Sequence, residues 1–330
     1  MKIYSQKEFS YVVSSISGYT DQTGGELLSK ALIGATTAKH ANVRLGIKGT
    51  QALNLLDSAP SFQSGVCGWN PSGTTTFKQH YITVCPEKLN EALCYKDLYT
   101  TYQSMLMNPG EVSETVPFEE AIMELKVKQI QQRIEQQLWQ ATKNGGSCFN
   151  GLKTLISTGS TIDGGSAGVG IGVSANGTAF STTATYGQDG NAITEVDKLI
   201  NALDDNALSR EDLVVFLSYA NFRIYLQTLT RANFFQNYIG STDVTGQMEA
   251  THPNTNIKVV PTIGLNGSNQ VVIGPKEYIV VGFDLLDDHE KINAWYSVDF
   301  DELRFRANYN YGVTIATFGS TVYFATNNLA

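Results

Sequence analysis

Residues 301–317 carry the pattern that most restricts how this chain can fold. Five apolar residues from Leu303 to Tyr311 occupy every second position, and Glu302, Arg304 and Arg306 are among the polar residues between them. Successive side chains of a β-strand point to opposite faces of a sheet. The alternation therefore predicts one long, half-buried strand with an apolar face and a charged face.

Residues 113–146 form the strongest predicted helix. A Ser/Thr cap and Pro117 start the helix, and glycines 145 and 146 end it. The predicted apolar stripe consists of Phe118, Ile122, Leu125, Ile130, Ile134, Leu138 and Ala141. No other predicted helix has a stripe long enough to cover the ribbon, so 100–150 and 290–330 are expected to share one domain.

The middle of the chain alternates between helices and short strands. Residues 192–203 and 219–235 have helical apolar spacing, and 212–218 predicts a buried strand between them. Three further short strands are predicted between residues 256 and 286, with turns separating them. The Gly/Ser/Thr-rich stretch 164–190 is expected to be a surface loop or weak hairpin. Together these elements predict an α+β or α/β unit with a central sheet.

Residues 61–84 predict a β-hairpin that needs a partner. A turn at 70–73 lies between two extended pieces, and Trp69 and Phe77 would be exposed on such a hairpin unless another surface covered them. The glycine-interrupted residues 1–60 are likewise expected to form an arm that lies against another surface.

The composition excludes several classes of function. Charged residues make up 16% of the 330 residues and the net charge is -8, so no basic surface for nucleic acid or for anionic lipid is expected. No apolar run is long enough to cross a bilayer, and the N-terminus has no signal-peptide pattern. The chain is therefore expected to be soluble and intracellular when it is made.

The motifs that suggest chemistry lack the context that the chemistry needs. The G-x-S-x-G match at 164–168 has neither a strand before it nor a helix after it, although His252 and His289 lie downstream. The glycines at 168–172 lack the elements of a dinucleotide site, and the acidic runs 203–206 and 283–291 lack the spacing of a calcium loop. Loops and solvated turns are predicted at these places, with no catalytic, cofactor or metal site.

The four cysteines are Cys67, Cys85, Cys94 and Cys148, and no two form a C-x-x-C pair. Free thiols are expected in a reducing compartment. A zinc site using the first three cysteines and His80 is the alternative, although zinc ligands normally come in close-spaced pairs.

The order of these segments resembles the major capsid protein of tailed bacteriophages, with the Hong Kong 97 phage-type fold. The resemblance runs from about residue 50 to 326 and rests on the hairpin followed by 116–145, 149–158, 212–231, 254–297 and 301–317. It implies an α+β fold with an N-terminal arm (1–50), an extended β-hairpin loop (51–100), the spine-helix part of a peripheral domain (101–150), an axial domain with connecting segments (151–290) and C-terminal strands of the peripheral domain (291–330).

The resemblance also implies a function, which is structural and not enzymatic. Such a protein self-assembles as hexamers and pentamers into the icosahedral shell of a virion, assembled in the host cytoplasm, that encloses double-stranded DNA without reading its sequence. The chain starts almost at the arm, which implies a separate scaffolding protein or a removed scaffolding segment, and a portal is a further expected partner. Contacts between subunits are expected at Trp69, Phe77, Lys78, Glu302, Arg304 and Arg306.

Two other classes of protein remain open from the sequence. The first is an encapsulin-type bacterial compartment, which has the same fold and an enzyme cargo. The second is an unrelated soluble hydrolase or carbohydrate-binding protein, which would be a stable monomer.

Overall fold

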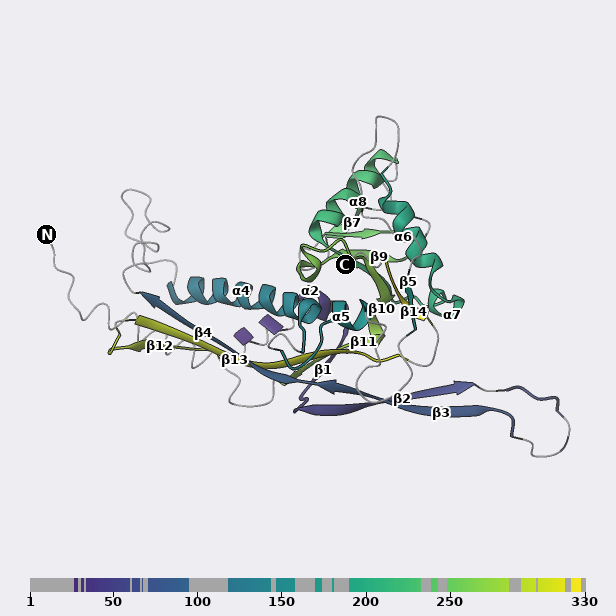
Figure 1. The fold of residues 1–330 in the computed structure, drawn as a ribbon, viewed down its shortest axis with the longest axis horizontal. Helices are drawn as coiled ribbons and strands as arrows, with labels where there is room; N and C mark the ends of the chain where they lie inside the picture. Colours follow the sequence, from purple (N-terminus) through teal and green to yellow (C-terminus); the bar gives the residue numbers. More distant parts are fainter. Residues whose placement is uncertain are drawn as a thin grey trace.

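The computed structural model describes the residues that are given at the end of this sentence: 27–28, 31–32, 34–59, 61–65, 67, 71–94, 118–143, 147–157, 170–173, 180, 190–232, 239–242, 248–253, 255–284, 292–300, 302–317 and 322–327. These residues form an elongated lobe, a triangular lobe above one part of it, and a projecting hairpin (Figure 1).

The elongated lobe is built on a five-stranded sheet whose central strand is β13 (Glu302–Ile315). The other strands are β1 (Asn42–Leu45), β4 (Cys85–Cys94), β11 (Ile279–Asp284) and β12 (Ile292–Ser297). Strands β4, β11 and β12 pair antiparallel with β13, and β1 runs parallel to β11. The 14-residue β13 confirms the long strand predicted from the alternation.

Burial along β13 follows the predicted alternation. Its apolar residues Leu303, Phe305, Ala307, Tyr309 and Tyr311 are at most 4% exposed, and the polar residues between them are half-buried. Helix α4 (Phe118–Gln140) lies along the sheet, and both contribute to one apolar core (Figure 1). The predicted helix therefore covers the predicted ribbon.

The buried stripe of α4 differs from the prediction at its N-terminal end. Leu125 is 55% exposed, whereas Met123 and Val127 are buried. Leu125 lies five positions before Ile130, which breaks the spacing of three or four that keeps residues on one helix face. The stripe that the structure buries is Met123, Val127, Ile130, Ile134, Leu138, Trp139 and Ala141. The side chains of Phe118 and Ile122 lie outside the described residues.

The triangular lobe contains a seven-stranded sheet between two layers. Its order is β5 (Gly170–Val173), β14 (Val322–Thr326), β10 (Val272–Pro275), β6 (Leu213–Leu217), β9 (Lys258–Pro261), β8 (Met248–Thr251) and β7 (Ile239–Thr242). Val215 and Leu217 of β6 pack with α6 (Ala192–Asn201) and α8 (Tyr219–Arg231), whereas Val214 and Phe216 join the core of the elongated lobe. Both faces of β6 are buried, as the sequence predicted for this strand.

Short elements complete the two lobes. They are α2 (Thr36–Lys39), α5 (Leu152–Ser157), α7 (Asp205–Leu208), η1 (Ile263–Leu265) and η2 (Lys276–Tyr278). The second half of the predicted turn at 203–206 is instead the start of α7, at Asp205 and Asn206. Within the run 168–172, expected to be a loop, residues 170–172 instead belong to β5, because Gly170 to Val173 pair in parallel with β14.

Strand pairing places three segments differently from the predicted domain bounds, although the division into domains stays a prediction. Strand β4 falls in the predicted loop and β11 in the predicted axial domain, yet both lie in the sheet of the elongated lobe. Strand β14 falls among the predicted peripheral strands and lies in the sheet of the triangular lobe. Local pattern predicted the strands but not their partners.

The described part of the predicted arm packs against its own chain. Leu28, Leu32 and Ala35 are buried in the core that contains α4, and β1 pairs with β11. For these described residues, the surface that the arm was expected to need is therefore provided by the chain's own core and sheet. Residues 1–26 lie outside the described residues.

The projecting hairpin consists of β2 (Thr50–Ala59) and β3 (Thr74–Thr83), paired from Thr50–Thr83 to Ala59–Thr74. It joins the elongated lobe where two glycines, Gly282 and Gly312, lie directly opposite each other on β11 and β13. A Cβ at Gly312 would lie 2.0 Å from the carbonyl oxygen of Thr83, so the missing side chain is what lets the hairpin lie this close to the sheet.

We expect Gly312→Ala to destabilise the protein by about 1–3 kcal/mol or more, because the clash is with backbone that has no rotamer to change. The measurement is the free energy of unfolding from a denaturant titration. Gly65→Ala is the matched control, since a Cβ there meets nothing within 4 Å. Equal unfolding midpoints for the two variants would contradict the expectation.

Candidate functional site: a projecting hairpin and an exposed sheet end

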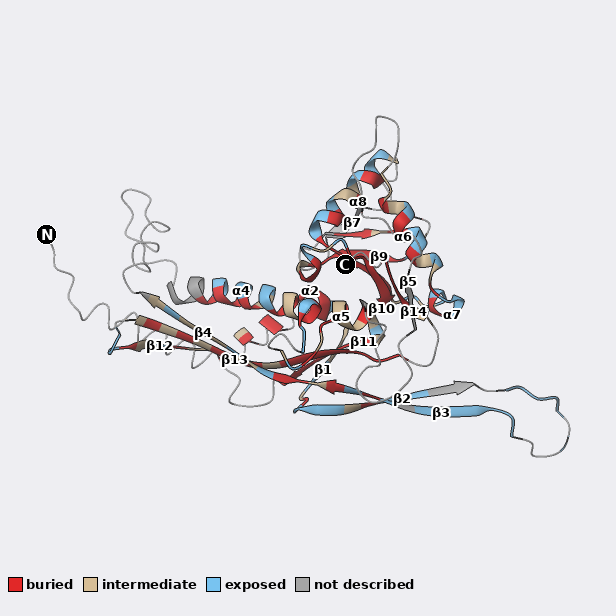
Figure 2. Ribbon diagram, in the orientation of Figure 1, coloured by how far each residue is buried: buried red, intermediate tan, exposed pale blue. Residues whose placement is uncertain are grey.

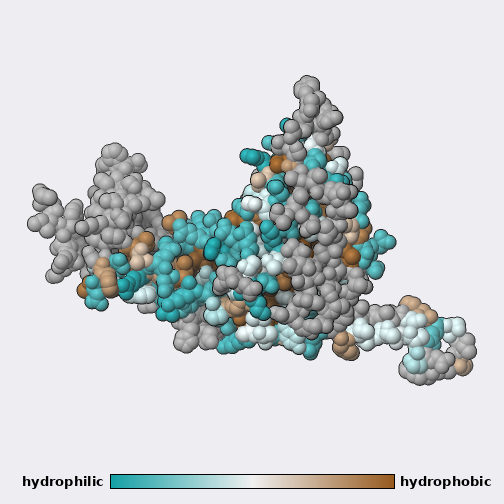
Figure 3. All heavy atoms as spheres, viewed as in Figure 1, coloured by the Kyte–Doolittle hydropathy of each residue, from teal (hydrophilic) through white to brown (hydrophobic). Residues whose placement is uncertain are grey.

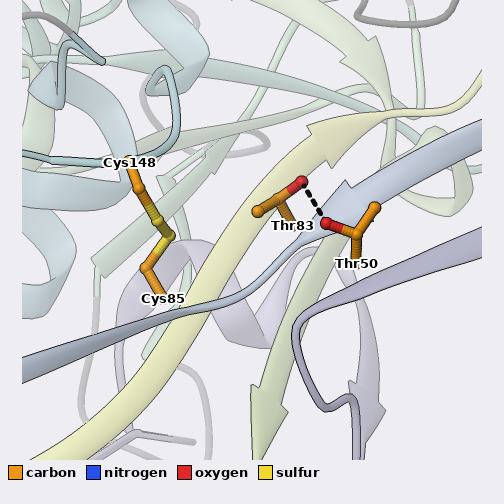
Figure 4. Close-up of a disulfide and its surroundings, with 4 residues drawn as sticks. All are labelled: Thr50, Thr83, Cys85 and Cys148. Atoms are coloured by element: carbon orange, nitrogen blue, oxygen red, sulfur yellow. Dashed lines mark hydrogen bonds between the residues drawn. A yellow bond between two sulfur atoms is a disulfide. The ribbon is translucent and has the colours of Figure 1, made fainter.

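The base of the hairpin is anchored in the elongated lobe. Leu53 and Ile82 are buried there with Ile47, Val280 and Ala316 in a small apolar cluster. His80 is 5% exposed, and its Nε2 donates to the carbonyl oxygen of Thr317 at 2.8 Å. The Thr50 and Thr83 hydroxyls lie 3.2 Å apart across the first pair of the ladder (Figure 4). The base is thus fixed by ordinary burial and hydrogen bonding.

The distal half of the hairpin exposes large apolar side chains. Phe77 is 80% exposed and Leu56, its direct cross-strand partner, is 61% exposed. Phe62, beyond the end of β2, is 98% exposed. Figure 2 shows the exposed class along much of the ribbon, and Figure 3 shows hydrophobic residues on it. An isolated two-stranded ribbon is marginal in water, and exposed apolar groups of this size mark interaction surfaces.

The structure places two of the predicted loop residues, Phe77 and Lys78, on this hairpin. Phe77 is exposed, as the sequence reasoning required. Lys78 lies on β3 opposite Leu55, and its side chain is outside the described residues. Trp69 lies outside the described residues altogether. The roles of these residues in a contact between chains therefore stay predictions.

The predicted ribbon residues lie together on β13, on the face that does not carry the buried apolar residues. Arg304 Nε lies 4.0 Å from Glu302 Oε2, and Arg306 Nε donates to Asn308 Oδ1 at 3.1 Å. Arg304 also stacks over the ring of Phe300 at 4.8 Å. Each arginine therefore has a neighbour within the chain, although Glu302 and Arg304 keep about a third of their side chains in solvent.

Sequence reasoning missed an apolar group at the same end of the sheet. Trp295, opposite Arg304 in the ladder, is 40% exposed. Val298 and Phe300, in the turn between β12 and β13, are 83% and 65% exposed. The signal was two apolar residues within a tight turn, "SVDFD". This sheet end and the hairpin lie at opposite ends of the elongated molecule (Figure 1).

A disulfide joins Cys85, the first residue of β4, to Cys148 in the loop after α4 (Figure 4). The Cα atoms lie 6.2 Å apart, within the normal range. The expectation of four free thiols is therefore wrong for these two, and Cys85 is not available to the alternative zinc site. Cys67 is free and exposed, and the side chain of Cys94 lies outside the described residues. Sequence spacing gave no signal for a pair 63 residues apart.

A chain of polar groups in the triangular lobe has the residue types of a catalytic relay. Tyr225 OH lies 2.9 Å from His252 Nδ1, and His252 Nε2 lies 2.8 Å from Asp197 Oδ1. Tyr225 is fully buried, and burial raises the pKa of its hydroxyl, which keeps it protonated. The relay therefore ties α6, α8 and the end of β8 together. The G-x-S-x-G match lies outside the described residues, as does His289.

Two negative findings apply to the described residues only. No group of three or more potential ligands is placed to hold a metal ion. No described helix is both long enough and apolar enough to cross a membrane.

Comparison with known proteins identifies the fold. No protein-family model matches the sequence, and no curated protein matches it either. Solved structures do match. A chain of the satellite phage P4 procapsid including size determination (Sid) protein has a TM-score of 0.55 at 11% identity, over 92% of this chain and 98% of that one. The fold is that of phage major capsid proteins.

Two more capsid-fold structures support this assignment. The capsid of an empty GTA particle gives a TM-score of 0.52 at 11% identity over 88% of both chains. A chain of Microbacterium phage Oxtober96 gives 0.51 at 10% identity, over 88% of this chain and 90% of that one. The α+β capsid fold expected from the order of segments is therefore confirmed.

Loss of the disulfide should lower the free energy of unfolding by about 2–4 kcal/mol, because the cross-link restricts the unfolded chain. The measurement is the melting temperature of Cys148→Ser, and of the parent with and without a phosphine reductant. Cys67→Ser, an exposed free cysteine, is the control and should melt as the parent does. Four titratable thiols in the folded, air-oxidised protein would contradict the disulfide itself.

Proposed function

We propose that this chain is a structural major capsid protein, which assembles with copies of itself into the shell of a tailed phage. The observation that carries the proposal is the distal hairpin, where Phe77, Leu56 and Phe62 are more than half exposed on a ribbon that projects from the folded lobes. In a monomer these apolar groups stay in contact with water, which is unfavourable. A neighbouring copy that covers them removes this unfavourable contact.

The shape of the molecule favours head-to-tail association. The hairpin and the sheet end around Trp295 and Phe300 are different surfaces at opposite ends, so a contact between them is heterologous and generates rings when the rotation closes. Rings of six and five copies are the units that the proposal requires for an icosahedral shell. Glu302, Arg304 and Arg306 then supply polar contacts beside the apolar ones, and Trp69 and Lys78 belong to the reaching loop.

The charge of the chain suits a container. With a net charge of -8, the protein has little electrostatic attraction for phosphate, so double-stranded DNA is held by confinement and not by specific contacts. The proposal includes assembly in the host cytoplasm, a separate scaffolding protein and a portal, and no enzymatic activity. A strongly salt-dependent affinity of the subunit for duplex DNA would count against this arrangement.

Phe77→Ser tests the proposal. The side chain is 80% exposed, so the free energy of unfolding of the dilute subunit should change by no more than about 0.5 kcal/mol. Assembly, followed by light scattering and negative-stain microscopy, should be lost or need a much higher concentration. Thr76→Ala is the matched control, because Thr76 is an exposed neighbour on β3 with little apolar area to lose.

Three outcomes would contradict the proposal. The first is a Phe77→Ser subunit that assembles as the parent does, and the second is a parent that stays monomeric at every concentration. The third is protection of the Phe77 and Leu56 side chains from hydroxyl-radical labelling in the dilute monomer. Closed shells that are recovered from cells with protein cargo and no DNA would instead identify an encapsulin-type compartment.

A further inference from the structure

One buried carboxylate joins three parts of the chain. Glu135 on α4 is 2% exposed. Its Oε2 accepts from the backbone N–H of Thr37 at 3.0 Å, and its Oε1 accepts from the hydroxyls of Thr37 and Thr262. Thr37 belongs to α2, and Thr262 is the cap of η1 in the triangular lobe. A single side chain of the spanning helix thus holds both the N-terminal segment and the triangular lobe.

The two hydroxyls have no freedom to turn away from Glu135. Thr37 Oγ1 already accepts from the indole N–H of Trp139 at 2.6 Å, and Thr262 Oγ1 accepts from the backbone N–H of Gly264 at 3.1 Å. Each hydroxyl has one proton, and each uses that proton to donate its hydrogen bond to Glu135. The carboxylate is the common acceptor at the end of both chains of hydrogen bonds, so its position fixes theirs.

Further contacts join the two lobes at the same place. The indole of Trp139 covers Gly264, where a Cβ would lie 2.1 Å from the ring, and packs on Phe216 at 5.4 Å. Gln140 Nε2 donates to the carbonyl oxygen of Gly264 at 2.7 Å. Residues 135, 139 and 140 lie on one side of α4, so the helix presents its last two turns to η1.

Stability alone does not explain a carboxylate at this position. Burial raises the pKa of Glu135, and the groups that oppose this shift are hydrogen-bond donors of Thr262, Thr37 and Trp139. Hydrogen bonds repay only part of the cost of burying a charge, and apolar residues of similar volume are often more stable in such places. Unlike an apolar side chain, the carboxylate fixes the orientation of its neighbours, because its oxygens form hydrogen bonds only with donors that point at them.

We propose that the Glu135 cluster, which consists of Glu135, Thr37, Trp139 and Thr262, sets the angle between the triangular and elongated lobes and thereby the curvature of the assembled shell. The curvature part rests on the proposed function. When both lobes contact neighbours, the angle between them fixes the rotation from one copy to the next. The same N-terminal segment also lies beside β8, where His40 Nε2 is 3.0 Å from Glu249 Oε1.

Thr262→Val tests the inference, because it keeps the shape of the side chain and removes the one hydroxyl that the triangular lobe gives to Glu135. Thr228→Val is the matched control. Thr228 is equally buried, and its hydroxyl donates to the carbonyl oxygen of Ile224 within α8, so it loses one hydrogen bond inside a single lobe.

Two measurements separate the inference from the proposed function. In small-angle X-ray scattering of the dilute subunit, Thr262→Val should change the radius of gyration and Thr228→Val should not. In electron micrographs of assembled particles, Thr262→Val should broaden or shift the distribution of diameters, again unlike the control. Thr262→Val could instead lower the melting temperature as Thr228→Val does and leave the scattering or the diameters unchanged. The cluster would then be an ordinary structural contact, and the inference would be overturned. A parent that never assembles refutes the shell function, and the scattering of the subunit still decides the lobe angle.

Discussion

The rest of the structure depends on the packing of α4 against the apolar face of β13. That face, from Leu303 to Tyr311, is almost completely buried, and the stripe of α4 from Met123 to Ala141 belongs to the same core. Strand β13 in turn holds β4, β11 and β12. Because the apolar residues of β13 alternate strictly, a register shift of one residue would expose all of them, so the sheet has one way to form.

The same core reaches the triangular lobe and stops short of the hairpin. Phe216 and Val260, on one face of the seven-stranded sheet, belong to the same core as α4, and the indole of Trp139 packs against Gly264. The hairpin shares only a small cluster at its base. This division separates the two lobes, which share a core, from a hairpin whose distal apolar groups have no partner among the described residues. The proposed assembly follows from that division, and the Glu135 cluster lies where the two lobes join.

Much of the local structure was predictable from residue types. The long strand, the long helix, α6, α8 and β6 follow from period and burial pattern, and the exposed Phe77 follows from its place on a hairpin. The buried stripe of α4 was partly misread at Leu125, since two overlapping series of apolar residues were present. The pairing of β1 with β11, the placement of β14 and the Cys85–Cys148 bond had no local signal. Each joins segments that are far apart in sequence.

By itself, the sequence determined most of the stretches that become strands and helices and, through their order, a capsid fold. That information is local, because side-chain period reports which face of an element avoids water. Only the tertiary structure decided that the described arm lies on its own chain, that an apolar group gathers at the turn before β13, and that Glu135 meets Thr37 and Thr262. These features depend on which surfaces meet in space. The local sequence around a buried glutamate in a helix does not differ from that around an exposed one, so only the neighbours in the folded structure distinguish the two.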